Sequence, residues 1–211
     1  MKGLQVRSMN SSIQKKIRVM SVEDDPDFRF LINALLEREQ DFILVGSTDN
    51  RNDAIEMSRH VNPHIVLMDL NLVPGKELGG IEAAKEIRLA SHAKVILLTA
   101  IEDPQVSIEA SKKSFASGYI FKSQFELIPE TLRATAWGST PQEDFIKALI
   151  LSELSVAEKT VLEMILGKDI RLLSSDKTIA NQKTKIFKKL GVRSGNDLVH
   201  LLGSFRSLRH L

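Results

Sequence analysis

Acidic side chains, a threonine and a lysine follow four hydrophobic segments of this chain, each at the point where the segment ends. Glu23 and Asp24 follow the first segment, Asp69 the third, Thr99 the fourth and Lys122 the fifth. Crowded carboxylates repel one another and need a cation to stay ionised, and oxygen donors without cysteine or histidine favour Mg²⁺ over zinc or copper. The lysine and the hydroxyl suggest phosphoryl chemistry at this site, because Lys122 can neutralise phosphate oxygens and Thr99 can donate a hydrogen bond to one. Asp69 is then a candidate nucleophile that forms an acyl phosphate.

Any one of these side chains alone would usually be a turn, capping or strand-end residue. Their occurrence at successive strand ends predicts a site, because the carboxyl ends of parallel strands meet at one edge of a sheet. Hydrophobic runs that alternate with amphipathic segments indicate a parallel sheet covered on both faces. We therefore predict a five-stranded, doubly wound α/β domain of flavodoxin-like architecture. The predicted strands are 17–22, 42–45, 64–70, 94–98 and 119–121, and the predicted helices are 28–39, 51–60, 80–88, 105–114 and 125–137.

The net charge of +2 conceals two halves of opposite sign. Residues 17–137 carry a net charge of −6, whereas residues 138–211 carry +4 and residues 1–16 carry another +4. The Gly-Ser-Thr-Pro run from Gly138 is the clearest break in the chain. Unequal charge suggests a different partner for each half. We predict a flexible basic leader at 1–16, an α/β domain at 17–137, a linker at 138–153 and a small basic all-α domain at 154–211.

The composition narrows the class of protein further. Apolar residues make up 43% of the 211 residues and charged residues 27%, which is ordinary for a globular protein. The absence of cysteine excludes a disulfide framework, a thiolate metal site and a cysteine nucleophile, and it fits a reducing compartment. No run approaches 18 apolar residues and the leader has no apolar core, so we expect no membrane partner and a cytoplasmic location.

The basic half shows the start and stop signals of three helices. Ser155 and Glu158 form a capping box, and Gly167 follows that first helix. A second helix, 177–190, is expected after Ser174 to Asp176, and Ser194 with Asp197 is expected to cap a third. Six basic residues and no acidic residue lie between Lys177 and Arg193. Such a helix is either a nucleic-acid surface or simply a soluble one.

The segments VEDDP, MDLNL, LLTA and YIFKS over residues 17–137 resemble the receiver domain of bacterial two-component response regulators. The resemblance implies that Glu23, Asp24, Asp69 and the backbone carbonyl of Asn71 hold Mg²⁺, and that Asp69 is the phosphoacceptor. Thr99 becomes the switch hydroxyl and Lys122 the phosphate-binding lysine, whereas Asp25 occupies a more variable position. Tyr119 matches the aromatic residue that rotates on activation, although a plain half-buried strand aromatic remains the alternative.

Two features depart from the receiver pattern. Ser123 stands where many receivers have a proline, so a cis peptide bond is not expected after Lys122. The loop after Asp69, LNLVPGKELGG, looks longer than is common in the family. Neither change removes a chemical group, so phosphorylation competence is still expected.

The segments LSVAEKTVLEMI and SDKTIANQKTKIFKKLGVRS over residues 154–202 resemble the helix-turn-helix output domain of NarL/FixJ (LuxR-type) regulators. The resemblance implies that 177–190 is the recognition helix and that the terminal helix from Asn196 is a dimer contact. Lysines mainly bind phosphate, while Asn181 or Gln182 are candidates for reading base edges. The residues placed near DNA are Thr178, Asn181, Gln182, Lys183 and Lys185.

The output domain departs from that pattern where the family has a scaffold helix. Only seven residues, KDIRLLS, separate Gly167 from Ser175, and Asp169, Ile170 and Leu172 are a candidate remnant of that helix. Ala180 also replaces a residue that is commonly basic in the family. The shortening leaves DNA binding lost, altered or dependent on dimerisation.

The sequence leads to one principal interpretation and two rivals. The principal one is a response regulator that accepts a phosphoryl group on Asp69 from a sensor histidine kinase, forms a homodimer and controls transcription through DNA. The first rival is a regulator that binds other proteins through a degenerate output domain. The second is an enzyme such as a haloacid-type phosphatase, which Asn71 argues against because that class has a second aspartate there.

Overall fold

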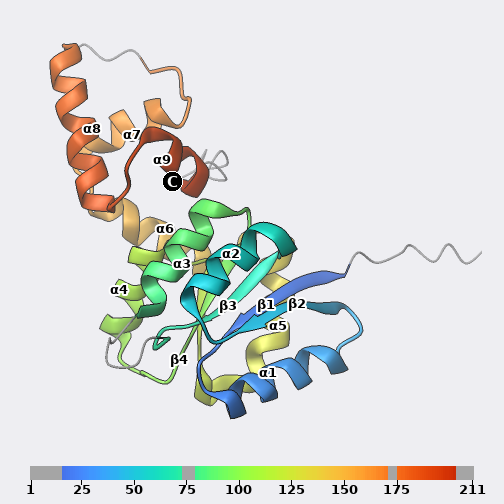
Figure 1. Cartoon of the computed structure of the whole chain (residues 1–211). Coiled ribbons are helices and arrows are strands. Elements are labelled where there is room, and N and C mark those ends of the chain that lie inside the picture. The colour runs from blue at the N-terminus through green and yellow to red at the C-terminus, as the bar shows by residue number, and fades with distance from the viewer. Residues whose placement is uncertain (1–15, 73–78, 171–174, 203–211) are drawn as a thin grey trace, which may run out of the picture.

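The computed structural model describes residues 16–72, 79–170 and 175–202. Five parallel strands form one sheet in the order β2-β1-β3-β4-β5, and helices cover both of its faces (Figure 1). This confirms the doubly wound α/β prediction, since parallel neighbours require crossover connections. The strands are β1 (Ile17–Val22), β2 (Phe42–Thr48), β3 (Ile65–Asp69), β4 (Lys94–Thr99) and β5 (Gly118–Phe121). The crossover helices are α1 (Pro26–Arg38), α2 (Arg51–Val61), α3 (Gly79–Ala90) and α4 (Pro104–Ser114), and α5 (Ile128–Ala136) follows β5.

Alternate residues of each strand supply two separate cores. Met20 and Val66 pack with α2, α3 and α4 on one face of the sheet, whereas Val19 and Leu67 pack with α1 and α5 on the other. All four side chains are fully buried. Burial on both faces explains why these strands are apolar throughout instead of alternating with polar residues.

The helix predicted at 125–137 differs from the observed one. A 3-10 segment, η1 (Lys122–Leu127), comes first, and α5 starts at Ile128. Pro129 explains the late start, because proline fits the first turn of a helix but has no N–H to donate further along it. The described residues contain no cis peptide bond, as expected from Ser123.

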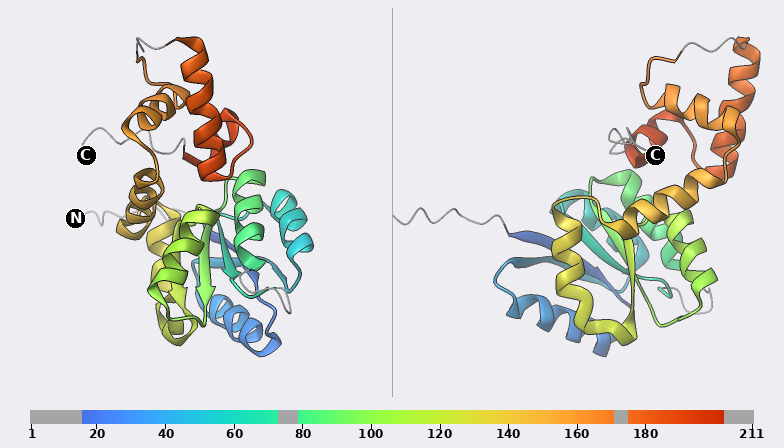
Figure 2. Two further views of the ribbon diagram at one scale, coloured as in Figure 1. Left: turned by 90° about the vertical axis from the view of Figure 1, so that its left-hand side faces the viewer. Right: turned by 180° about the vertical axis from the view of Figure 1, so that it is seen from behind.

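The predicted linker at 138–153 contains a helix, α6 (Pro141–Ser152). Thr140 caps it by accepting the backbone N–H of Glu143 at 3.1 Å, and Pro141 occupies the first turn. The side chain of Gln142 bonds both backbone groups of Tyr119 at 3.2 Å, so α6 covers the free edge of β5. The segment between the domains is therefore helical and docked on the receiver edge (Figure 2).

Three further helices pack with α6 and Phe115 in a third core. They are α7 (Val156–Ile165), α8 (Asp176–Leu190) and α9 (Gly195–Leu202). The predicted capping box is present: Ser155 Oγ accepts from Glu158 N, and Glu158 Oε2 accepts from Ser155 N at 2.7 Å. None of the helices that the structure describes is long and apolar enough to cross a lipid bilayer.

The predicted remnant of a scaffold helix is not helical at Asp169 or Ile170. Gly167, at φ +88°, ends the turn after α7, and the next described helix is α8. Leu172 and the loop residues 73–78 after Asp69 lie outside the described residues.

Candidate functional site

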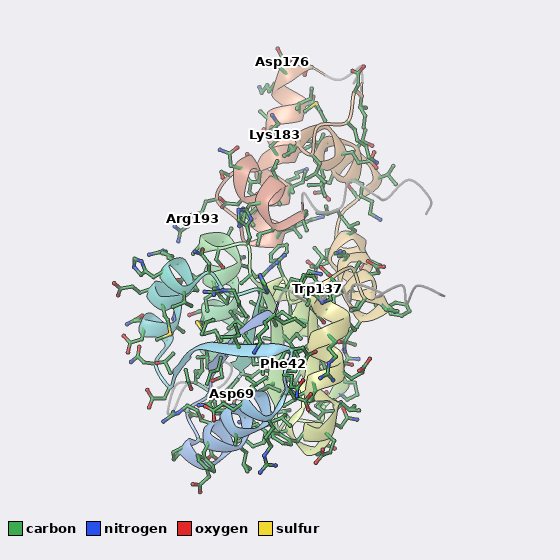
Figure 3. All side chains as sticks on the ribbon, turned by 90° about the vertical axis from the view of Figure 1, so that its right-hand side faces the viewer. Phe42, Asp69, Trp137, Asp176, Lys183 and Arg193 are labelled. Carbon is green, nitrogen blue, oxygen red and sulfur yellow. The ribbon has the colours of Figure 1, made fainter. Side chains whose placement is uncertain are left out.

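The register of the sheet brings the predicted site residues to one edge. Asp69 pairs with Leu98, the residue before Thr99, and Thr99 pairs with Phe121, the residue before Lys122. On the other side of β3, Val22 pairs with Met68, so Glu23 is level with Asp69. The four strand ends predicted to converge therefore do so, at the end of the receiver away from α8 (Figure 3).

Three carboxylates form the centre of this edge. Glu23, Asp24 and Asp69 each offer an oxygen, and these oxygens all lie within 4.8 Å of one another. Asp25 does not join them, because its Oδ1 caps α1 by accepting the N–H groups of Asp27 and Phe28 at 2.9 and 3.1 Å. The structure thus separates the acidic pair from the capping residue, as the resemblance implied.

Lys122 is the cation that faces these carboxylates. Its Nζ lies 2.6 Å from Glu23 Oε1 and 3.3 Å from Asp69 Oδ2. The same ammonium group lies 4.8 Å from the ring centroid of Phe28, whose ring packs edge to face with that of Phe125 at 5.7 Å between centroids. Burial by itself disfavours the lysine's charge, but the bond to Glu23 and the charge of Asp69 outweigh it and raise the pKa of Lys122.

Lys122 alone does not pair with all the carboxylate oxygens of the site, and the unpaired oxygens indicate that the site binds a metal ion. Glu23 Oε2 and Asp69 Oδ1 are buried and accept no hydrogen bond from the part of the chain that the structure describes. Burial raises the pKa of Glu23 to about 7 and also raises the pKa of Asp69, with the charge of Lys122 opposing both shifts. Buried, under-coordinated oxygens on adjacent carboxylates fit Mg²⁺, which takes one or two carboxylates together with waters and phosphate oxygens.

These pKa shifts predict how the stability depends on pH. The pKa of Glu23 is near 4.5 in the unfolded chain and about 7 in the folded one, so the folded state binds the extra proton between these values. Stability should therefore fall by roughly 3 kcal/mol as the pH rises through this window. Mg²⁺ should raise the melting temperature clearly at pH 8 and little at pH 5.

Calorimetric scans with and without Mg²⁺ at the two pH values check this prediction. The matched control is Glu23→Gln, which cannot titrate and should lose the part of the pH dependence that Glu23 contributes, whereas the raised pKa of Asp69 still contributes its own part. An equal Mg²⁺ effect at both pH values in the wild-type protein would contradict the account.

The two predicted switch residues occupy different surroundings. Thr99 is buried, and its Oγ1 accepts the N–H of Ile101 at 2.9 Å, which ties the hydroxyl to the loop after β4. Tyr119 is half-buried on β5 against the sheet core, with its ring 5.6 Å from that of Phe121. Asn71 is exposed two residues after the end of β3, and its backbone bonds the carboxyl group of Asp69.

Some residues at this edge are not predicted from the sequence. Phe28 falls within the predicted helix 28–39, but its contact with Lys122 depends on the tertiary fold. Arg29 donates to the backbone carbonyl of Glu23 at 2.7 Å and pairs with Asp49 at 3.3 Å, so it fixes the acidic turn. Both lie within six residues of Glu23, but no spacing rule marks them.

The residues predicted to face DNA divide into two groups on α8. Thr178, Asn181 and Lys185 are exposed, whereas Gln182 and Lys183 are half-buried on the flank nearer the core. The buried side of the helix carries Ile186 and Leu190. The fully outward face also carries Lys177, Thr184 and Lys188, which are not among the predicted contacts.

The helical output domain is docked on the receiver by polar and apolar contacts. Lys85 on α3 donates to the carbonyls of Leu190 at 3.0 Å and Gly191 at 2.5 Å, at the C-terminus of α8. Arg88 bonds Leu201 O at 3.3 Å, and Phe115 from the receiver is buried in the core of the output helices. Lysine at a helix C-terminus also complements the helix dipole.

Comparisons with known proteins agree with this geometry. The family model of the response regulator receiver domain matches residues 19–133. BvgA of Bordetella pertussis, named as a positive transcription regulator of virulence factors, is 27% identical over 207 residues, covering 87% of this chain and 95% of BvgA. The transcriptional regulatory protein LiaR of Bacillus subtilis is 30% identical, covering 83% of this chain and 81% of LiaR.

Two solved structures extend the similarity beyond the receiver. A LuxR-family response regulator from Aurantimonas sp. SI85-9A1 is 30% identical with a TM-score of 0.52, covering 66% of this chain and 98% of that one. The RcsB response regulator of Salmonella typhimurium is 26% identical with a TM-score of 0.52, covering 90% of this chain and all of that one.

The parallel five-stranded sheet carries an acidic cluster and a lysine at its carboxyl edge, and these features define a receiver domain. A helical output unit follows it. The chain belongs to the response regulator family, and its relatives are LuxR-type transcription regulators. The family resemblance seen in the sequence is thereby confirmed.

Proposed function

We propose that Asp69 accepts a phosphoryl group from a phosphohistidine of a sensor kinase. A carboxylate oxygen of Asp69 attacks phosphorus, the phosphorus–nitrogen bond breaks, and the histidine nitrogen leaves with the electron pair. The observation that carries this proposal is the placement of Asp69 at 3.3 Å from Lys122 and within 4.8 Å of two further carboxylates. Such a site holds a cation and a phosphoryl group together, whereas an isolated strand-end aspartate does neither.

The neighbouring residues have separate roles in this proposal. Glu23, Asp24, Asp69 and the Asn71 carbonyl are the proposed Mg²⁺ ligands, and bound Mg²⁺ neutralises charge on the phosphoryl oxygens. Lys122 exchanges part of its contact with Glu23 for a phosphoryl oxygen. Thr99 moves to donate a hydrogen bond to another oxygen, and this movement breaks the bond that its Oγ1 now accepts from Ile101 N. The loop after β4 follows Thr99, and this movement is the start of the switch.

Tyr119 connects this movement to the output domain. Its backbone is held by Gln142, which lies at the start of α6, and α6 continues into the output core through Ile146 and Ile150. A phosphoryl group adds roughly −1.5 to −2 charge at the far edge of the same strands. We propose that inward rotation of Tyr119 is transmitted along this route.

The output domain is proposed to bind DNA through α8. Its exposed lysines, Thr178 and Asn181 are not covered by the receiver helices. The solved structure of the RcsB relative is described in terms of its interaction with DNA, which supports the same partner class here. We further propose a homodimer on activation, with α9 as its contact, acting in the cytoplasm as a regulator and not as an enzyme.

A salt series tests the DNA-binding part of the proposal. The affinity for a mixed-sequence duplex should fall steeply with salt, by roughly 0.9 in log affinity per log salt for each phosphate contacted. Fluorescence anisotropy of the labelled duplex measures this slope. A protein that does not bind even at low salt would favour the rival function, a regulator that acts on other proteins.

A further inference from the structure

The exposed face of α8 ends, at the C-terminus of the helix, beside the receiver domain. Lys177, Asn181, Thr184 and Lys188 recur at spacings of four, three and four residues and are all exposed, so they form one outward stripe of the helix. Lys188 is near the C-terminal end of this stripe. There α8 meets α4 and α6 across a cleft of about 270 Å³, and Lys188 is one of its lining residues.

The receiver contributes basic residues to the same cleft. Lys113, on the last turn of α4, exposes 66% of its side chain and lines the cleft opposite Lys188. The cleft is strongly cationic, since its titratable lining residues are five lysines and two glutamates: Lys85, Lys112, Lys113, Lys188, Lys189, Glu109 and Glu153.

The ion pairs leave two of these lysines available. One lysine, Lys112, lies 2.6 Å from both Glu109 Oε1 and Glu153 Oε1, so the two lining carboxylates converge on it. Lys85 and Lys189 are also engaged, the first by carbonyls of α8 and the second by Glu158 at 2.7 Å. Among the described residues, Lys188 has no ion pair and Lys113 has one at 3.9 Å, to Glu109.

We propose that Lys113 of the receiver contacts the phosphate backbone of the DNA that α8 binds. The proposal rests on the proposed DNA binding of the output domain. A duplex presents one negative charge for about every 1.7 Å of its axis, so a strand that runs along the α8 stripe continues past Lys188 to Lys113. An elongated polyanion fits this arrangement because the two available lysines are exposed, belong to different elements and line the same cleft.

The contact requires the docked arrangement of the two domains. Lys85 and Arg88 hold the C-terminal ends of α8 and α9 on α3, and this keeps Lys113 and Lys188 on one cleft. Since phosphate contacts carry no sequence information, Lys113 adds affinity without changing which sequences are preferred. The receiver thereby takes part in DNA binding directly, in addition to its role as the phosphoryl acceptor.

The test is the salt slope of the full chain on a mixed-sequence duplex. Lys113→Gln should lower the slope by roughly one, as Lys188→Gln does, while labelling from acetyl phosphate and the melting temperature stay unchanged. The charge-matched control is Arg59→Gln. Arg59 is an exposed residue of α2, and α3 lies between α2 and α4 (Figure 1). This variant should keep the wild-type slope.

The outcomes are distinguishable. If Lys188→Gln loses one unit of slope and Lys113→Gln loses none, the receiver contact is overturned and DNA binding by α8 stands. If Arg59→Gln and Lys113→Gln lose slope equally, net charge explains the effect and the contact is overturned. If the wild-type protein shows no salt-dependent binding, the proposed DNA binding fails and the Lys113 contact fails with it.

Discussion

Asp69→Asn should reduce the incorporation of label from acetyl phosphate to background, in the presence of Mg²⁺. The side chain keeps its size and its place at the end of β3, but an amide cannot form the acyl phosphate that a carboxylate forms. The loss should be complete because Asp69 supplies the atom that bonds to phosphorus. Quantifying the retained label on the purified protein measures it.

The matched control for this experiment is Asp25→Asn. It makes the same chemical change close to the site, at a residue that caps α1 and does not join the acidic cluster. Asparagine is as good an N-cap as aspartate, so this variant should fold and label normally. Equal labelling of the Asp69→Asn variant and the wild-type protein would remove Asp69 from the mechanism.

Gly80→Ala should both destabilise the receiver and abolish labelling, although Gly80 has no functional group. A β-carbon at this position would lie 1.9 Å from the carbonyl oxygen of Asp69 and 2.9 Å from the Cα of Leu70. Both are backbone atoms, and Gly80 N already donates to Leu70 O at 2.9 Å. The clash can therefore be relieved only by moving the backbone of α3 or of the end of β3. We expect a loss of about 3 kcal/mol in the free energy of unfolding, at the upper end of overpacking effects.

Urea unfolding and acetyl phosphate labelling of the same preparation check both parts. The control is Gly138→Ala, because a β-carbon there meets no atom within 4 Å. That variant should stay within about 0.5 kcal/mol of the wild-type stability and label fully. If Gly80→Ala is as stable as the control, the close packing of α3 against β3 is not what positions Asp69.

The parallel strands and the convergence of their ends could be predicted from the sequence. Apolar runs predict parallel strands, and parallel strands bring Glu23, Asp69 and Thr99 to one edge. The contact of Lys122 with the ring of Phe28 could not be predicted, because it depends on how α1 lies over the sheet. Periodicity reports that a helix position is apolar but not which distant side chain it meets.

The segment after Gly138 shows a second feature that the sequence predicts only in part. The same Ser-Thr-Pro run that marks a break also starts a helix, since Thr140 is its cap and Pro141 is its first residue. The predicted linker at 138–153 therefore contains a helix that the break signal alone does not reveal. The docking of α6 on β5 through Gln142 could not be predicted, because an amide that pairs with a strand edge has no sequence pattern of its own.

The most direct test of the proposed function is the DNA affinity of one protein sample before and after phosphorylation by acetyl phosphate with Mg²⁺. We predict that phosphorylation tightens binding of the wild-type protein to a mixed-sequence duplex by about 5-fold or more, the lower range of allosteric coupling. The Asp69→Asn variant should show no change under the same treatment. An unchanged affinity in the phosphorylated wild-type protein, or an equal change in the variant, would contradict phosphorylation-controlled DNA binding through Asp69.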